Sequence, residues 1–251
     1  MGESEFIFGL HTVIEAINSG KEIEKILARK GLQGELYHKL TDLAHKMQIP
    51  LQLVPVEKID RITRKNHQGI VAFISPIVYF NIEEITPKLF EEGKTPLLLI
   101  LDQITDVRNF GAIARSAELA GVDAIIIPEK GAAQINSDAL KTSAGALHLI
   151  PVCRVKNLVS TVKFLKNSGL KIVAATEKGG KFYDETNLTD PVAIIIGSED
   201  LGIEAGLLRI ADEWVKIPQK GKIESLNVSV AAGIIIYEVV RQRRQSQITN
   251  K

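Results

Sequence analysis

The most constraining feature of this 251-residue chain is a series of short, nearly continuous apolar runs in its second part. Runs of four or five apolar residues are too short to cross a bilayer and are typical of strands buried on both faces. Such strands alternating with helical patterns predict an α/β fold with a parallel sheet covered by helices. The expected strands are 97–101, 124–127, 172–175, 192–196 and 214–217, and the expected helices are 111–120, 137–147, 158–167, 203–210 and 228–243.

The first part of the chain has weaker signals of the same two kinds. They predict a small α/β/α domain with helices at 11–18 and 35–47 and strands at 23–28, 51–54 and 70–74. A polar stretch from Asn81 to Lys94 contains Pro87 and Gly93 and is typical of a linker. We therefore expect a first domain at 1–78, a linker at 79–95, a second domain at 96–245 and a fraying tail at 246–251.

Composition limits the kinds of partner and chemistry. The chain has 31 Lys and Arg against 30 Asp and Glu, so a polyanionic partner needs a local basic patch rather than overall charge. The single cysteine, Cys153, cannot form an internal disulfide, and no Cys/His spacing indicates a zinc site. The cysteine count and spacing therefore predict a reducing compartment and metal-free chemistry. Because no basic and apolar leader opens the chain, we expect a cytoplasmic protein.

Three turns beside the predicted strands carry glycine or asparagine, at 102–115, 197–202 and 217–229. Ligands of open α/β sheets bind at the carboxyl ends of strands, so these turns are expected to converge. Each turn alone also fits an ordinary structural role: Gly197 as a turn glycine, Asn109 or Phe110 as a helix start, Arg115 as a surface residue. The G-x-G-x-x-G string of classical dinucleotide enzymes does not occur.

Together the turns resemble a known family. The strings Asn109-Phe-Gly-Ala-Ile-Ala-Arg115, Ile196-Gly-Ser-Glu-Asp-Leu-Gly202, and Ile217-Pro218 followed by Ser225-Leu-Asn-Val-Ser229 are similar to the three ordered motifs of SpoU (TrmH-type) RNA ribose 2′-O-methyltransferases of the SPOUT superfamily. Near the N-terminus, Phe8-Gly-Leu-His-Thr-Val and Asn66-His-Gln-Gly-Ile resemble the L30e-like RNA-binding domain of some members. The pairing most resembles bacterial 23S ribosomal RNA guanosine-2′-O-methyltransferases.

The resemblance implies methyl transfer from S-adenosylmethionine to a ribose 2′-hydroxyl, in a domain with a deep trefoil knot. The family's cofactor-binding positions correspond to Gly197, Ile217 and Leu226, and Thr176 and Glu177 are expected nearby. We expect glycine at 197 because a side chain there would keep the backbone away from the ligand.

By the resemblance, the family's catalytic arginine corresponds to Arg115. The resemblance also implies that the catalytic site around it includes Asn109, Glu199, Ser225 and Asn227. A guanidinium stays protonated in proteins, so we expect Arg115 to clamp a phosphate and stabilise the developing alkoxide rather than to act as a base. The final proton acceptor is then phosphate or water. Glu199 has two open interpretations, a catalytic group or an acceptor of backbone hydrogen bonds within its turn.

Two further surfaces are expected to hold partners. Arg61, Arg64, Lys65 and His67 form a candidate RNA phosphate patch, with a solvated charged turn as the alternative. The helix at 228–243 repeats Val230, Ile234, Tyr237 and Val240 at helical spacing. Pattern alone favours packing on the chain's own sheet, whereas the resemblance implies a homodimer interface.

Alternatives remain at this point. A transfer RNA or adenosine-directed ribose methyltransferase of the same family would share these motifs, and a catalytically silent RNA-binding or ribosome-assembly protein would share the fold. Asp200, Gln219 and Glu224 depart from residues common in the family without removing a motif residue.

Overall fold

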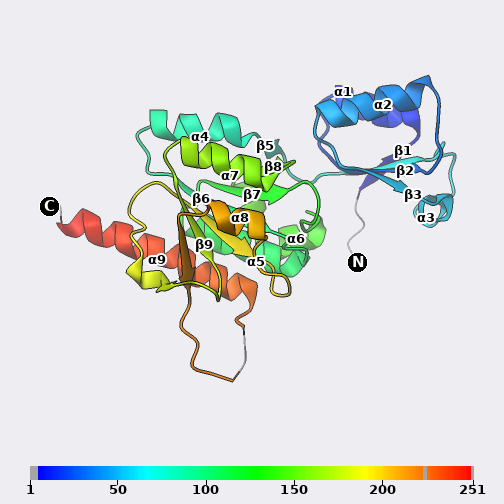
Figure 1. Ribbon diagram of the computed structural model, residues 1–251. Helices are drawn as coiled ribbons and strands as arrows, with labels where there is room; N and C mark the ends of the chain where they lie inside the picture. The colour runs from blue at the N-terminus through cyan, green and yellow to red at the C-terminus, as the bar shows by residue number, and fades with distance from the viewer. Residues whose placement is uncertain (1–4, 223–224, 250–251) are drawn as a thin grey trace. The chain divides into compact units, whose positions relative to one another are not determined.

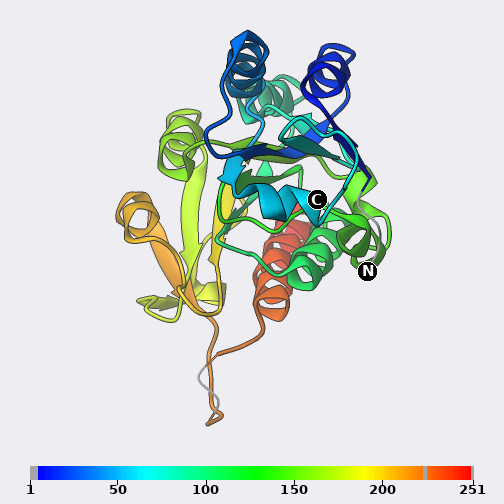
Figure 2. The same cartoon turned by 90° about the vertical axis from the view of Figure 1, so that its right-hand side faces the viewer.

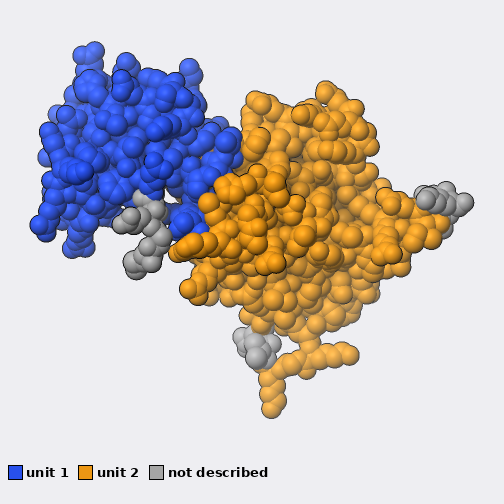
Figure 3. All heavy atoms as spheres, turned by 180° about the vertical axis from the view of Figure 1, so that it is seen from behind, with its two compact units in different colours: residues 1–78, 134–137 blue, residues 79–133, 138–251 orange. Residues whose placement is uncertain are grey.

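The computed structural model describes residues 5–222 and 225–249, which form two compact units. Unit 1 comprises residues 1–78 with 134–137, and unit 2 comprises 79–133 with 138–251 (Figure 3). Each unit has its own sheet and its own hydrophobic core.

Unit 1 is a four-stranded sheet in the order β1-β4-β2-β3, with helices on both faces (Figure 1). Strands β1 and β2 pair antiparallel with β4, and β3 pairs parallel with β2. The predicted helices and strands of this part are present, but β1 and α3 are too short for a periodic pattern to reveal. The elements are β1 (Phe6–Phe8), α1 (Leu10–Asn18), β2 (Ile23–Arg29), α2 (Glu35–Lys46), β3 (Leu51–Val54), α3 (Val56–Asp60) and β4 (Ile70–Ile74).

Unit 2 contains a parallel eight-stranded sheet in the order β10-β12-β9-β11-β6-β7-β8-β5. Every residue of β6 and of β11 is buried, as the continuous apolar runs predict. The five predicted strands are confirmed, and β5, β8 and β10 are additional. The strands are β5 (Tyr79–Phe80), β6 (Leu97–Asp102), β7 (Ala124–Pro128), β8 (Val152–Val155), β9 (Lys171–Ala175), β10 (Lys181–Phe182), β11 (Val192–Gly197) and β12 (Glu213–Lys216).

Helices cover both faces of this sheet, so the predicted fold class is confirmed. Figures 1 and 2 show α4, α7 and α8 on one face and α5 and α9 on the other. The helical segments are α4 (Ile82–Glu91), α5 (Val107–Leu119), α6 (Ser137–Thr142), η1 (Ala146–His148), α7 (Leu158–Asn167), η2 (Tyr183–Glu185), α8 (Ala205–Ile210) and α9 (Val228–Thr249). The trefoil knot stays a prediction.

The predicted linker is wrong, because its residues form β5 and α4. The Asn81 side chain accepts a hydrogen bond from the Glu83 amide at 2.9 Å and caps α4. Ile82 and Leu89 then pack into the core of unit 2. Because α4 has few apolar residues among its polar ones, its sequence is hard to distinguish from that of a polar linker.

The ends of two other predicted helices are also corrected. The helix expected at 137–147 stops at Thr142, because Ala144 (φ 50°) and Gly145 (φ 88°) adopt left-handed backbone conformations. The expected tail is wrong for residues 246–249, because α9 extends to Thr249. The Arg243 guanidinium fixes this helix by donating to backbone carbonyls of Thr95, Pro96, Leu188 and Asp190.

Candidate functional site

The three glycine- and asparagine-bearing turns converge at one edge of the unit 2 sheet. Strands β12, β9, β11 and β6 are neighbours and run parallel, so their carboxyl ends lie together. Gly197 at the end of β11 pairs with Asp102 at the end of β6. This is the arrangement that the strand and turn pattern predicts.

A cavity of about 300 Å³ opens at this edge. All five predicted cofactor residues line it: Thr176, Glu177, Gly197, Ile217 and Leu226. Its apolar wall includes Ile196, Leu208 and Val215, and its charged side chains are three carboxylates and one ammonium group, from Glu177, Glu199, Asp200 and Lys178. The lining therefore combines apolar residues with an excess of negative charge, which suits a ligand with an aromatic part and a positive charge.

Glycine is required at position 197 for a reason that the sequence does not show. A Cβ at this position would lie 2.2 Å from the backbone carbon of Gly202, well inside contact distance. The turn folds back on itself here, because the Gly202 amide donates to the Ser198 carbonyl at 3.0 Å. The glycine therefore allows the turn to close, and the expected close approach of a ligand to its backbone stays a prediction.

Asn109, Glu199 and Asn227 form one hydrogen-bonded network between the three turns. The Asn227 side-chain amide donates to Oδ1 of Asn109 at 3.0 Å and to Oε1 of Glu199 at 2.9 Å. The cap of α5 is Asp106, which accepts from the Asn109 amide at 2.7 Å, so the expected start at Asn109 or Phe110 is wrong. Because Asp106 supplies the cap, the Asn109 side chain is left to accept from Asn227.

Glu199 accepts hydrogen bonds, but from the third turn rather than from its own. Its Oε1 also accepts from the Val228 amide at 2.8 Å, and Val228 is the first residue of α9. A carboxylate at a helix N-terminus is stabilised by the helix dipole and by the unpaired amides there. Glu199 therefore joins the second turn to α9. Ser225 is exposed and lines the cavity.

Arg115 lies on α5 with an exposed side chain, outside the residues that line the cavity. Gly111, in the same motif, sits where a Cβ would come within 2.8 Å of Thr142 Cβ and 2.9 Å of the Ala139 carbonyl oxygen. This glycine allows α5 and α6 to approach closely. The first motif thus combines a packing residue, a network residue and an exposed cation.

Asp102 is a site residue that the sequence analysis did not single out. It is buried, and its Oδ2 accepts a hydrogen bond from the Glu204 amide at 2.7 Å, which connects β6 to the N-cap position of α8. Burial raises the pKa of its carboxyl group, and the hydrogen bond from Glu204 partly offsets that rise. An acidic residue that directly follows five buried apolar residues is the signal that could have identified it.

The residues of the candidate RNA patch follow α3 in unit 1. Arg61, Arg64 and Lys65 are exposed. His67 differs from them, because its Nδ1 accepts from the Gly69 amide at 2.9 Å and its Nε2 lies 2.9 Å from Oδ1 of Asp60. Both ring nitrogens of His67 are thus used to hold the turn.

Asp200 and Gln219, which depart from common family residues, line the cavity, while Glu224 lies outside the described residues. Within the described part of the chain, no three His, Cys, Asp or Glu side chains are grouped as a metal site would require. Nor does any helix there have the length and apolar character to cross a membrane.

Comparison with known proteins decides the family. The model of the SpoU rRNA Methylase family matches residues 96–237, more than half of the chain. The chain belongs to the SpoU rRNA Methylase family. A second model, described as the substrate-binding domain of RNA 2′-O ribose methyltransferases, matches residues 6–80. The chain is thus an S-adenosylmethionine-dependent RNA ribose 2′-O-methyltransferase.

Several relatives are similar to this SpoU protein, two of them along almost its whole length. A Staphylococcus saprophyticus protein, named provisionally as a TrmH family tRNA/rRNA methyltransferase, is 37% identical over 96% of this chain and 97% of its own. The AdoMet-bound rRNA methyltransferase of Sinorhizobium meliloti is 25% identical, with a TM-score of 0.60, and covers 94% of this chain and 86% of its own. The TrmH/SpoU tRNA modifying enzyme of A. aeolicus is 30% identical, with a TM-score of 0.56, and covers 67% of this chain and 87% of its own.

The cavity fits S-adenosylmethionine by the chemistry of its lining. The apolar wall suits the adenine ring, and the carboxylates of Glu177, Glu199 and Asp200 suit a sulfonium and an ammonium group. The cofactor of this SpoU protein is S-adenosylmethionine, which solved relatives from Streptomyces viridochromogenes and Sinorhizobium meliloti contain.

Proposed function

We propose that this enzyme methylates the ribose of a guanosine in 23S ribosomal RNA. The observation that carries the proposal is the presence of the substrate-binding domain at 6–80 in the same chain as the methylase domain. The rRNA methyltransferase of Sinorhizobium meliloti aligns with 94% of the chain, whereas the A. aeolicus tRNA modifying enzyme aligns with 67%. An enzyme that acts on a large, folded RNA needs a second RNA-binding surface more than an enzyme that acts on a small RNA does.

For the cofactor, we propose that Gly197, Ile217 and Leu226 provide backbone contacts, with Thr176 and Glu177 at the edge of the same cavity. When bound, S-adenosylmethionine supplies an electrophilic methyl group for in-line attack by the ribose oxygen. The chain's contribution is then to position the RNA beside this group and to exclude water. No metal is needed for this chemistry.

We propose that Arg115 contacts the RNA rather than the cofactor. Its exposure on α5, outside the cavity lining, leaves the guanidinium available to a phosphate beside the target ribose. Its positive charge stabilises the developing alkoxide, and the proton passes to phosphate or water because a guanidinium does not give up its own. Asn109, Glu199, Ser225 and Asn227 hold the turns around it.

Arg115→Ala is therefore expected to lower methyl transfer by at least about a hundredfold while cofactor affinity changes only a few-fold. Arg115→Lys separates charge from geometry, because lysine cannot form a bidentate clamp. Single-turnover transfer rates and calorimetry with S-adenosylmethionine measure the two effects. A lysine variant with the full rate would contradict the clamp.

The target itself is tested by mapping ribose methylation in RNA from cells with and without this protein. Loss of one methylated guanosine in 23S rRNA, restored by the wild-type chain and not by Arg115→Ala, supports the proposal. Loss of a tRNA or adenosine methylation would replace it with the corresponding alternative.

A further inference from the structure

Three phenylalanines lie on the sheet face of unit 1 that α1 and α2 do not cover. Phe6 and Phe8 are alternate residues of β1, so their side chains share a face, and Phe6 is paired with Phe73 of β4. The ring centroids of Phe6 and Phe8 are 6.4 Å apart, and those of Phe6 and Phe73 are 6.3 Å apart. We call Phe6, Phe8 and Phe73 the aromatic face.

The helix on this side of the sheet is too short to cover it. Figure 1 shows the sheet between the pair α1 and α2 and the single short helix α3. Five residues of helix span about 7.5 Å, whereas four strands span about 14 Å from first to last. Beneath α3 the residues Leu27 and Val71 are buried, and the three phenylalanines pack against this cluster but are themselves only partly buried.

Positive charge accompanies the aromatic face. Lys25 of β2 is paired with Phe73, and its Nζ lies 4.8 Å from the centre of that ring. Burial lowers the pKa of Lys25, the nearby Glu24 opposes this shift, and Lys58 on α3 adds to it. Two neighbouring ammonium groups repel each other, and an anion between them would relieve that repulsion. Arg61, Arg64 and Lys65 extend the positive charge beyond α3.

We infer that the aromatic face binds unpaired bases of the RNA substrate by stacking, while Lys25 and Lys58 hold the adjoining phosphates. Bases in a double helix are stacked on one another, so partly exposed aromatic side chains on a sheet select single-stranded or looped RNA. An apolar protein partner would bury the ammonium groups of Lys25 and Lys58 without supplying an anion, which disfavours that occupant. The inference rests on the proposed function only in taking RNA as the ligand.

The test compares the affinity of the full chain for a single-stranded RNA of about 12 nucleotides with its affinity for a blunt duplex of the same sequence, by fluorescence anisotropy. Phe6→Leu and Phe73→Leu keep an apolar side chain but remove the ring. Each is expected to weaken single-strand binding by about five- to 150-fold and to leave duplex binding unchanged. Phe73→Tyr, which keeps the ring, should bind within about twofold of the wild type.

Matched controls separate stacking from folding. Phe90→Leu alters a phenylalanine of α4 in unit 2 that is also partly exposed, and should not change RNA affinity. Lys25→Gln should reduce the salt dependence of single-strand binding by about 0.7 in log–log slope, the loss of one phosphate contact. Cross-linking with 5-iodouridine RNA should label peptides containing Phe6, Phe8 or Phe73, and needs no substitution.

Two results would overturn the inference. One is native affinity for single-stranded RNA in Phe6→Leu and Phe73→Leu variants whose urea midpoints match the wild type. The other is cross-linking confined to peptides without the aromatic face. Neither result bears on which nucleotide is methylated, so the proposed function is judged separately by the methylation map.

Discussion

The side-chain amide of Asn227 donates to Oδ1 of Asn109 at 3.0 Å, although the two residues are 118 positions apart. The same amide donates to Glu199 at 2.9 Å, so one side chain connects all three turns of the site. Glu199 in turn accepts from the first amide of α9. Because these contacts are shared, the turns are expected to behave as one unit.

Coupling between Asn109 and Asn227 is therefore the first prediction. Asn109→Ala and Asn227→Ala should each lower kcat/KM by about ten- to a hundredfold, because either change releases one turn from the others. The double variant should fall short of the product of the two effects, with an interaction energy of about 0.5–3 kcal/mol.

Steady-state rates of the four proteins give this energy directly. Asn167→Ala, at an exposed position on α7 outside the cavity, is the matched control and should be neutral. Strictly additive effects in the double variant would show that the hydrogen bond has no role in transfer.

Gly197→Ala is predicted to disrupt the cofactor cavity. The added Cβ would lie 2.2 Å from backbone carbon of Gly202, so the turn at 198–202 must open. Backbone cannot move aside as a flexible side chain can, and S-adenosylmethionine affinity should fall by at least about a hundredfold. Calorimetry measures the affinity, and Gly180→Ala, where nothing lies within 4 Å of the new Cβ, should bind normally.

Elements of the fold could be predicted from the sequence where they produce a local pattern of apolar residues. The buried strands β6 and β11 and the convergence of their following turns could be predicted, because apolar runs and parallel order leave few alternatives. Helix α4 could not, because a few inward residues such as Ile82 and Leu89 are hidden among polar ones and only the core shows their use.

Roles that depend on distant partners could not be predicted. Gly197 lines the cavity, but its part in closing the turn depends on the backbone of Gly202, which a sequence pattern does not reveal. Asp106 takes the cap that Asn109 was expected to form, which leaves the Asn109 side chain for Asn227. The buried Asp102 escaped notice because its partner amide is 102 residues away.

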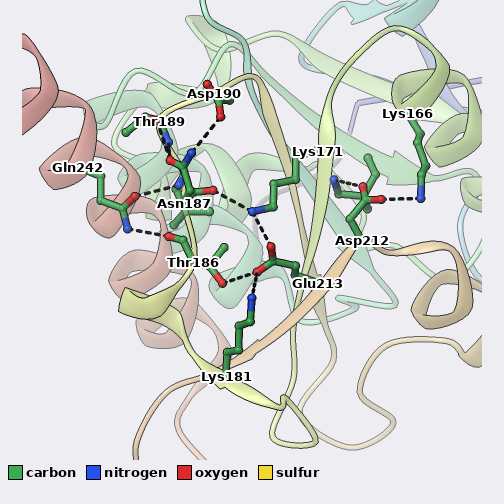
Figure 4. Close-up of polar contacts among 12 residues, drawn as sticks. Lys166, Lys171, Lys181, Thr186, Asn187, Thr189, Asp190, Asp212, Glu213 and Gln242 are labelled. Carbon is green, nitrogen blue, oxygen red and sulfur yellow. Dashed lines mark hydrogen bonds and ion pairs between the residues drawn. The ribbon is translucent and has the colours of Figure 1, made fainter.

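The acid stability of unit 2 is predicted to depend on Glu213. Figure 4 shows its carboxylate between Lys171, Thr186 and Lys181, at 2.9, 2.7 and 3.2 Å. The hydrogen bond from Lys171 is the largest cause, and with that from Thr186 it lowers the pKa of Glu213 from 4.5 to about 2. The folded protein thus binds this proton more weakly than the unfolded chain does, and the ionised carboxylate stabilises the fold above pH 4.5.

This contribution should disappear as the pH falls from 4.5 towards 2. Glu213→Gln is expected to lower the free energy of unfolding by on the order of 2 kcal/mol at neutral pH, and by much less at the acid end of that range. Urea titrations at several pH values measure the difference. Glu91→Gln, at an exposed carboxylate of α4, is the control, and a pH-independent loss in Glu213→Gln would refute the assignment.

Homodimer formation through α9 is the last prediction. One side of this helix packs inside unit 2, where Ile235, Ile236 and Val239 are fully buried. Of the stripe predicted for the interface, Val230 and Tyr237 are 50% and 48% exposed, whereas Ile234 and Val240 are partly buried. Light scattering at micromolar concentration should give about twice the chain mass, and Tyr237→Glu should give a monomer because it places a charge in the apolar stripe.

Subunit mixing tests whether such a dimer shares its RNA. In the shared arrangement, one subunit binds the RNA through Arg61, Arg64 and Lys65 while the target ribose enters the partner's site. An Arg115→Ala chain then lacks only the catalytic arginine, and a chain altered at the three cations lacks only the RNA-binding patch. Mixing the two should then restore up to about a quarter of wild-type activity, because half of the dimers are mixed and each has one intact pairing. If each subunit works alone, the mixture stays as inactive as its parents, and the dimer has no part in holding the substrate.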